Sequence, residues 1–76
     1  MRFPREILNE IKWRKDMDLS RCQVTFVHRG APNDVLSIRG DEITELGRSF
    51  FRVGQTSIPY HRIQQIIYDE QIVYSA

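Results

Sequence analysis

Residues 21–28 read Arg21-Cys22-Gln23-Val24-Thr25-Phe26-Val27-His28, and their side chains alternate between two kinds along the chain. In a β-strand such alternation places every second side chain on the same face. The β-branched and aromatic residues of the stretch also favour strand geometry. The stretch therefore predicts a β-strand whose inward face carries Cys22, Val24, Phe26 and His28.

A helix is expected over residues 4–15, ahead of this strand. Pro4 suits the first helical position, where a missing backbone N–H costs nothing. An apolar stripe at helical spacing follows, formed by Ile7, Leu8 and Ile11. We expect this stripe to pack on the inward face of the sheet, and its apolar contact to be extended by Phe3 and Trp13.

Short strands separated by turns are expected in the rest of the chain. The turns are indicated by glycine, proline, asparagine and aspartate, above all in the segment 30–34. The expected strands are 35–38, 50–53, 56–58, 63–68 and 71–74. Residues 43–46 are expected to continue the strand 35–38 beyond a break at Gly40-Asp41. Residues 60–62 are expected to form a helical turn.

This pattern predicts an α+β fold in a single domain, residues 1–76, with its β region at 21–74. The N-terminal helix packs on a small antiparallel sheet of five to six short strands. We expect that sheet to curve into a partly open barrel, with the helix covering one end or face.

Composition limits the classes of function. The net charge of +1 indicates no overall basic field, yet nine of the eleven basic residues are arginine. Arginine suits bidentate contact with phosphate, although surface solubility alone also explains such a bias. The lone Cys22 predicts no disulfide and no zinc site, and the glycine spacing predicts no nucleotide cofactor. A cytoplasmic protein with no membrane contact is expected.

Two His-Arg pairs are the candidate binding groups. His28-Arg29 and His61-Arg62 each lie where a predicted strand gives way to a turn containing proline. Arginine and histidine together can bind phosphate, and the ring of Tyr60 could stack on a base. The alternative is structural: His28 would hold its turn through a hydrogen bond, and His61 would cap the helical turn.

Three blocks of the sequence resemble a known family. They are Val27-His28-Arg29-Gly30-Ala31-Pro32, Gly47-Arg48 and Ile58-Pro59-Tyr60-His61-Arg62-Ile63. The chain resembles the RNA cyclic-group-end recognition domain family of small, mostly archaeal, uncharacterised proteins over nearly its whole length. The family usually has Gly-Asp after Ala31-Pro32, where this chain has Asn33-Asp34. Because asparagine accepts positive φ more readily than other non-glycine residues, we expect the turn to keep its shape.

The resemblance implies a module that binds RNA ends carrying a 2′,3′-cyclic phosphate. From the residues themselves we expect no catalytic residue and no metal. In the binding-module hypothesis the site residues are His28, Arg29, Tyr60, His61 and Arg62, with Arg48 joining them. Two alternatives stay open at this point. One is a small phosphodiesterase-type enzyme that uses His28 and His61 as acid and base in a shared pocket. The other is a protein-interaction domain, with partners in RNA processing, whose His-Arg turns are only structural.

Overall fold

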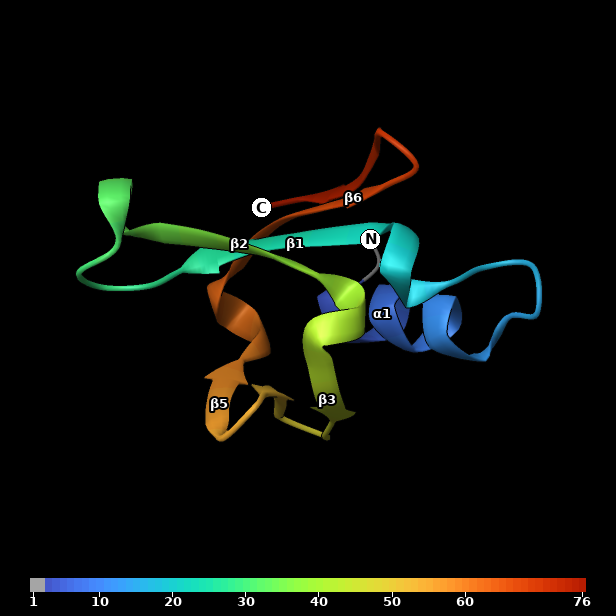
Figure 1. Ribbon diagram of the computed structural model, residues 1–76, viewed down its shortest axis with the longest axis horizontal. Helices are drawn as coiled ribbons and strands as arrows, with labels where there is room; N and C mark the ends of the chain where they lie inside the picture. Colours follow the sequence, from blue (N-terminus) through green and yellow to red (C-terminus); the bar gives the residue numbers. More distant parts are fainter. Residues whose placement is uncertain (1–2) are drawn as a thin grey trace.

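The computed structural model describes residues 3–76 and contains one α-helix and two antiparallel sheets (Figure 1). The helix α1 spans Pro4–Trp13. One sheet has four strands in the order β2-β1-β6-β7, and the other has three in the order β3-β4-β5. The strands are β1 (Cys22–Val27), β2 (Val35–Arg39), β3 (Ile43–Leu46), β4 (Phe50–Val53), β5 (Thr56–Pro59), β6 (Ile63–Tyr68) and β7 (Gln71–Ser75).

The α+β class is confirmed. The expected partly open barrel is not supported, because the strands form two sheets that do not close on each other. Two short 3₁₀ turns direct the chain from one sheet to the other. Gly40–Glu42 separates β2 from β3, and Tyr60–Arg62 separates β5 from β6. As a result β3 does not continue β2, and pairs instead with β4 in the second sheet.

Gly40 allows the first of these turns to form. A Cβ atom at this position would lie 2.6 Å from the carbonyl oxygen of Leu19 and 3.1 Å from Cβ of Cys22. Any side chain would therefore push the turn away from the start of β1. The close approach therefore requires glycine at this position.

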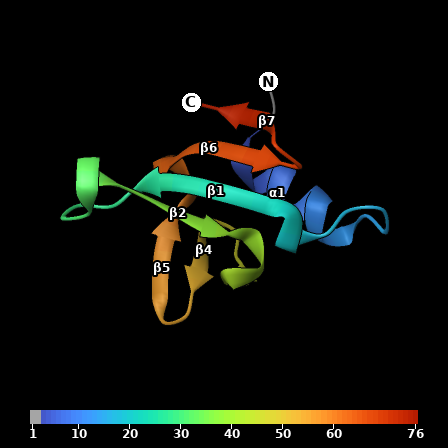
Figure 2. The same cartoon turned by 45° about the horizontal axis from the view of Figure 1, so that its top comes forward.

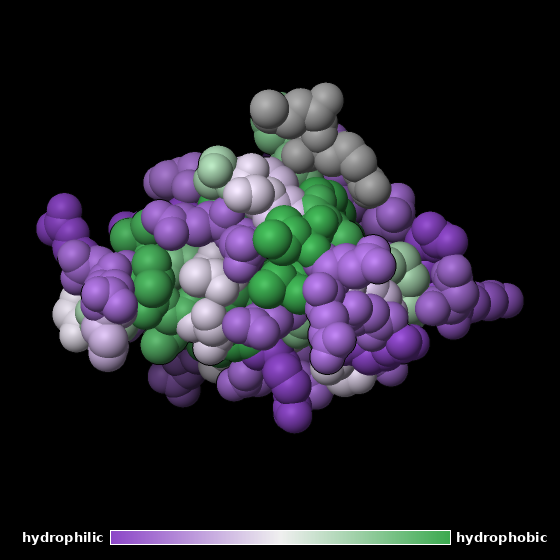
Figure 3. Space-filling model, turned by 90° about the horizontal axis from the view of Figure 1, so that it is seen from above, coloured by the Kyte–Doolittle hydropathy of each residue, from purple (hydrophilic) through white to green (hydrophobic). Residues whose placement is uncertain are grey.

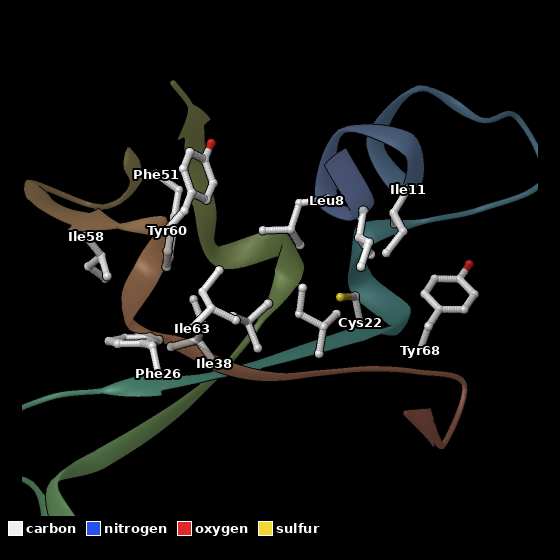
Figure 4. Packing of buried hydrophobic residues seen from close by; sticks show 13 residues of the cluster. Leu8, Ile11, Cys22, Phe26, Ile38, Phe51, Ile58, Tyr60, Ile63 and Tyr68 are labelled. Atoms are coloured by element: carbon white, nitrogen blue, oxygen red, sulfur yellow. The ribbon is translucent and has the colours of Figure 1, made fainter. Parts of the chain in front are cut away.

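The core lies between α1, the inner face of the four-stranded sheet and the smaller sheet (Figures 2 and 4). The predicted docking of α1 is confirmed, since Leu8 and Ile11 are buried in one cluster with Val24, Phe26 and Ile66. Phe51 of β4 is fully buried in the same cluster. The two sheets and the helix therefore share a single core.

The two ends of α1 differ from the sequence prediction. The helix ends at Trp13, and the backbone of Arg14 that follows is extended. The guanidinium of Arg14 forms an ion pair with Asp16 at 2.8 Å. Phe3 and Trp13 do not extend the apolar contact: their exposed fractions are 64% and 76%.

The outer face of the four-stranded sheet is open to solvent and mixes apolar with polar side chains (Figure 3). Thr25 and Ser37 share a hydrogen bond of 2.7 Å on exposed positions of paired strands. Ile72 and Val73 of the edge strand β7 are also exposed. Within residues 3–76 the only α-helix is α1, and its ten residues are too few to cross a bilayer.

Candidate functional site

The loop after β1 is held by its own backbone. The N–H of His28 donates to the carbonyl of Asp34 at 2.8 Å, and the N–H of Asp34 donates to the carbonyl of Ala31 at 2.8 Å. Gly30 has φ of 92°, and Asn33 and Asp34 have φ of 58° and 57°. The predicted positive φ at Asn33 is therefore confirmed. Hydrogen bonds within the loop fix the backbone that carries the side chains of His28 and Arg29.

The sheet register brings the second His-Arg pair to the same end of the sheet. In the β1–β6 ladder Phe26 is opposite Ile63. The loop that follows β1 therefore lies beside the 3₁₀ turn Tyr60–Arg62 that precedes β6. Segments that are far apart in the sequence meet here because β1 and β6 are hydrogen-bonded neighbours in the sheet.

A hollow of about 550 Å³ lies between these two segments. We call it the cationic hollow; it is lined by Val27, His28, Arg29 and Arg62. The side chains of His28, Arg29 and Arg62 are exposed. His28 and Arg29 of the first predicted pair therefore lie around the same hollow as Arg62 of the second pair.

The guanidinium groups of Arg29 and Arg62 form no ion pair with any carboxylate of residues 3–76. Arg5 and Arg48 also have no ion pair within residues 3–76, whereas four other arginines do. They pair with nearby carboxylates, the pairs being Arg14 with Asp16, Arg21 with Asp69, Arg39 with Asp41 and Arg52 with Glu45. The positive charge at the cationic hollow is therefore not neutralised by a paired carboxylate.

One carboxylate belongs to the loop that forms the hollow. An oxygen of Asp34 accepts a hydrogen bond from the backbone N–H of Gly30 at 3.4 Å. This side chain holds the loop and lies outside the lining of the hollow. Two guanidinium forks and an imidazole around an open space can bind an anion with two or three acceptor oxygens, such as a phosphate diester.

His61 lies in a different hollow. The aromatic hollow, as we call it, has a volume of about 300 Å³ and is lined by Phe3, Pro4, Arg5, Tyr60, His61 and Tyr74. Because a 3₁₀ turn rotates the chain by about a third of a circle per residue, His61 and Arg62 point to different sides. His28 and His61 line different hollows, so the expected shared pocket is not found.

Tyr60 is a core residue, and its expected role as a stacking ring does not fit its burial. The side chain is 8% exposed and lies next to the ring of Phe51, with centroids 5.7 Å apart (Figure 4). Its hydroxyl donates to the carbonyl of Gly47 at 2.7 Å. Burial raises the pKa of this phenol above its usual value, an effect that the nearby Arg5 opposes.

Arg48 lies in the turn between β3 and β4 and is exposed. It lines neither the cationic hollow nor the aromatic hollow. Phe3, Arg5 and Tyr74 were not anticipated from the sequence as site residues. The signal in the sequence was a phenylalanine immediately before Pro4, a position where a polar capping residue is preferred.

Comparison with known proteins places these residues in a family context. The family model described as the MJ1316 RNA cyclic group end recognition domain matches residues 1–75. A UPF0248 protein of Thermococcus onnurineus is 38% identical over 63 residues, which cover 83% of this chain and 71% of the relative. A UPF0248 protein of Archaeoglobus fulgidus is 29% identical over 68 residues, which cover 88% and 96% of the two chains. No solved structure gives a significant match.

Proposed function

Because the chain belongs to the family described as the MJ1316 RNA cyclic group end recognition domain, we propose that it binds the 2′,3′-cyclic phosphate end of an RNA strand. The phosphate occupies the cationic hollow. The observation that carries the proposal is the convergence of His28, Arg29 and Arg62 on one open space without a paired carboxylate among residues 3–76. The protein acts as a binding module, and no bond of the RNA is made or broken.

The chemistry of the end matches the lining of the hollow. A cyclic phosphate is a monoanion with two non-bridging oxygens, which suits two donor forks approaching from different segments. Arg29 and Arg62 supply those forks, and the imidazole of His28 supplies a further donor. Val27 offers an apolar wall for the ribose carbon atoms. An RNA that ends in a hydroxyl has no phosphate to place in this position.

Titration of two matched RNAs tests the proposal. One short single strand carries a 5′ fluorophore and ends in a 2′,3′-cyclic phosphate, and the other has the same sequence and ends in a 3′-hydroxyl. Fluorescence anisotropy should give tighter binding of the cyclic end. Chromatography of the recovered RNA should show the ring intact. Equal affinity for the two ends would refute the proposal.

Two substitutions locate the site. Arg62→Gln should weaken binding of the cyclic end by about tenfold or more, the usual effect of losing a hydrogen bond to a charged group. Arg62→Lys keeps the charge but loses the planar fork of donors, so its affinity should lie between those of the wild type and Arg62→Gln. The control is Arg48→Gln, which removes the same charge from an exposed turn outside the hollow. Equal losses for Arg62→Gln and Arg48→Gln would show that net charge alone drives the binding.

A further inference from the structure

Folding does not account for the ring of Phe3. The residue stands at the N-cap of α1, where a serine, threonine or aspartate would accept a hydrogen bond from the first turn. Phe3 makes no such bond, and its side chain is 64% exposed. The ring therefore gains little from burial, and it borders the aromatic hollow together with Tyr74.

The rim of the aromatic hollow is cationic. Arg5 and His61 are both exposed and line it. Neither forms an ion pair with a carboxylate of the described residues 3–76. Flat apolar rings beside guanidinium and imidazole groups match a planar aromatic ligand with polar edges. A nucleobase has this chemistry, because its face stacks on a ring and its edge accepts hydrogen bonds.

The two hollows lie on either side of the same 3₁₀ turn. Arg62 lines the cationic hollow, and its chain neighbour His61 lines the aromatic hollow. The Cα atoms of consecutive residues are about 3.8 Å apart. Adjacent residues of one turn therefore border the two hollows, an arrangement that suits a ligand with a phosphate at one end and a flat ring at the other.

Resting on the function proposed above, we propose that the aromatic hollow binds the terminal base of the same RNA end, with Phe3 as the stacking ring. The phosphate then contacts Arg62 on one side of the turn, and the base lies beside His61 on the other. Tyr74 forms a second wall of the hollow. Recognition of the end thus combines a charge site with a stacking site.

An RNA without its last base tests this inference. The probe ends in a 2′,3′-cyclic phosphate on a ribose that carries hydrogen in place of the base, and it is compared with the same RNA ending in adenosine. Removal of the base should weaken binding to the wild type by about 5- to 100-fold, the range for loss of one base–aromatic stack. Adding 2′,3′-cyclic AMP should also shift the amide resonances of Phe3, Arg5 and Tyr74 in NMR spectra.

Phe3→Leu keeps an apolar side chain and removes the ring. This variant should bind the adenosine end more weakly than the wild type does. Its affinity should be the same for the RNA with and without the terminal base, because the two changes remove the same contact in a double-mutant cycle. The control is Trp13→Leu, which removes another exposed ring, at the C-terminal end of α1. It should behave as the wild type.

The outcomes separate the two proposals. If the wild type binds both cyclic ends equally but still prefers them to a hydroxyl end, the base site is refuted and the phosphate site stands. If Phe3→Leu and Trp13→Leu lose affinity equally, Phe3 is not the stacking ring. If the wild type shows no preference for the cyclic end, the proposed function fails, and the base site fails with it.

Discussion

At the scale of single residues, burial separates the groups that hold the fold from those that are free to bind. Tyr60 and His61 are neighbours, yet the first is in the core and the second is exposed. His28 combines both roles in different atoms. Its backbone N–H holds the loop through Asp34, while its side chain lines the cationic hollow.

Cys22 gives a pH prediction at this scale. The side chain is 2% exposed, and burial raises the pKa of its thiol to about 11. At a pH between the ordinary thiol pKa of 9.0 and the raised pKa of about 11, the thiol has lost its proton in the unfolded chain but retains it in the folded protein. The folded state then binds more protons, so the free energy of unfolding falls as the pH rises through this window. The expected fall from this group is on the order of 2 kcal/mol.

Urea unfolding at about pH 8 and about pH 10.5 measures this fall. Cys22→Ala lacks the thiol and serves as the reference, because the tyrosines and lysines that also titrate in this range are common to both proteins. The wild type should lose more stability than Cys22→Ala between the two pH values. Parallel losses would mean that Cys22 is accessible to water in the folded state.

At the scale of elements, α1 illustrates how a short helix depends on tertiary contact. Ten residues are too few for a stable isolated helix in water. The N-cap lacks a side-chain hydrogen bond, so local capping contributes little. The stability of α1 comes from the buried stripe of Ile7, Leu8 and Ile11 against the sheet.

Leu8→Ala tests that dependence. The side chain is fully buried, so its truncation should lower the free energy of unfolding by about 2–5 kcal/mol. The matched control is Trp13→Ala, which truncates an exposed side chain of the same helix. It should change the free energy of unfolding by about 0.5 kcal/mol or less. Chemical denaturation followed by circular dichroism measures both. Similar small effects for the two variants would show that α1 is not docked through Leu8.

At the scale of the whole molecule, the net charge hides how the charges are distributed. The formal net charge is +1, with eleven basic and ten acidic residues. Several arginines are paired with carboxylates, while Arg29 and Arg62 have no such partner within residues 3–76. A nearly neutral protein can therefore present a local cationic surface to an anionic ligand.

Salt dependence tests this distribution. Binding of a single-stranded RNA end through two or three cations should weaken as salt rises, with log K falling against log salt by about 0.7 per phosphate contact. Arg62→Gln should reduce that slope by about 0.7, whereas Arg48→Gln should leave it unchanged. Anisotropy titrations at several salt concentrations provide the slopes. An identical change of slope in both variants would place the binding charge outside the cationic hollow.

Much of the local structure could be determined from the sequence by itself. Alternation over residues 22–27 and the turn residues beyond them identify nearly every strand, and the helical stripe identifies α1. The positive φ of Asn33 could also be predicted, because few other residues tolerate it. These features depend on the chemistry of neighbouring residues, which is visible in the sequence.

Only the tertiary structure decided which strands pair and which side chains converge. The pattern of strands is the same for a barrel and for two sheets, and the difference lies in the 3₁₀ turns at Gly40–Glu42 and Tyr60–Arg62. The β1–β6 register joins Arg62 to His28 and Arg29, while rotation of the turn sends His61 to Phe3 and Arg5. Such placements depend on long-range packing and on the rotation of a single turn, and the sequence pattern records neither.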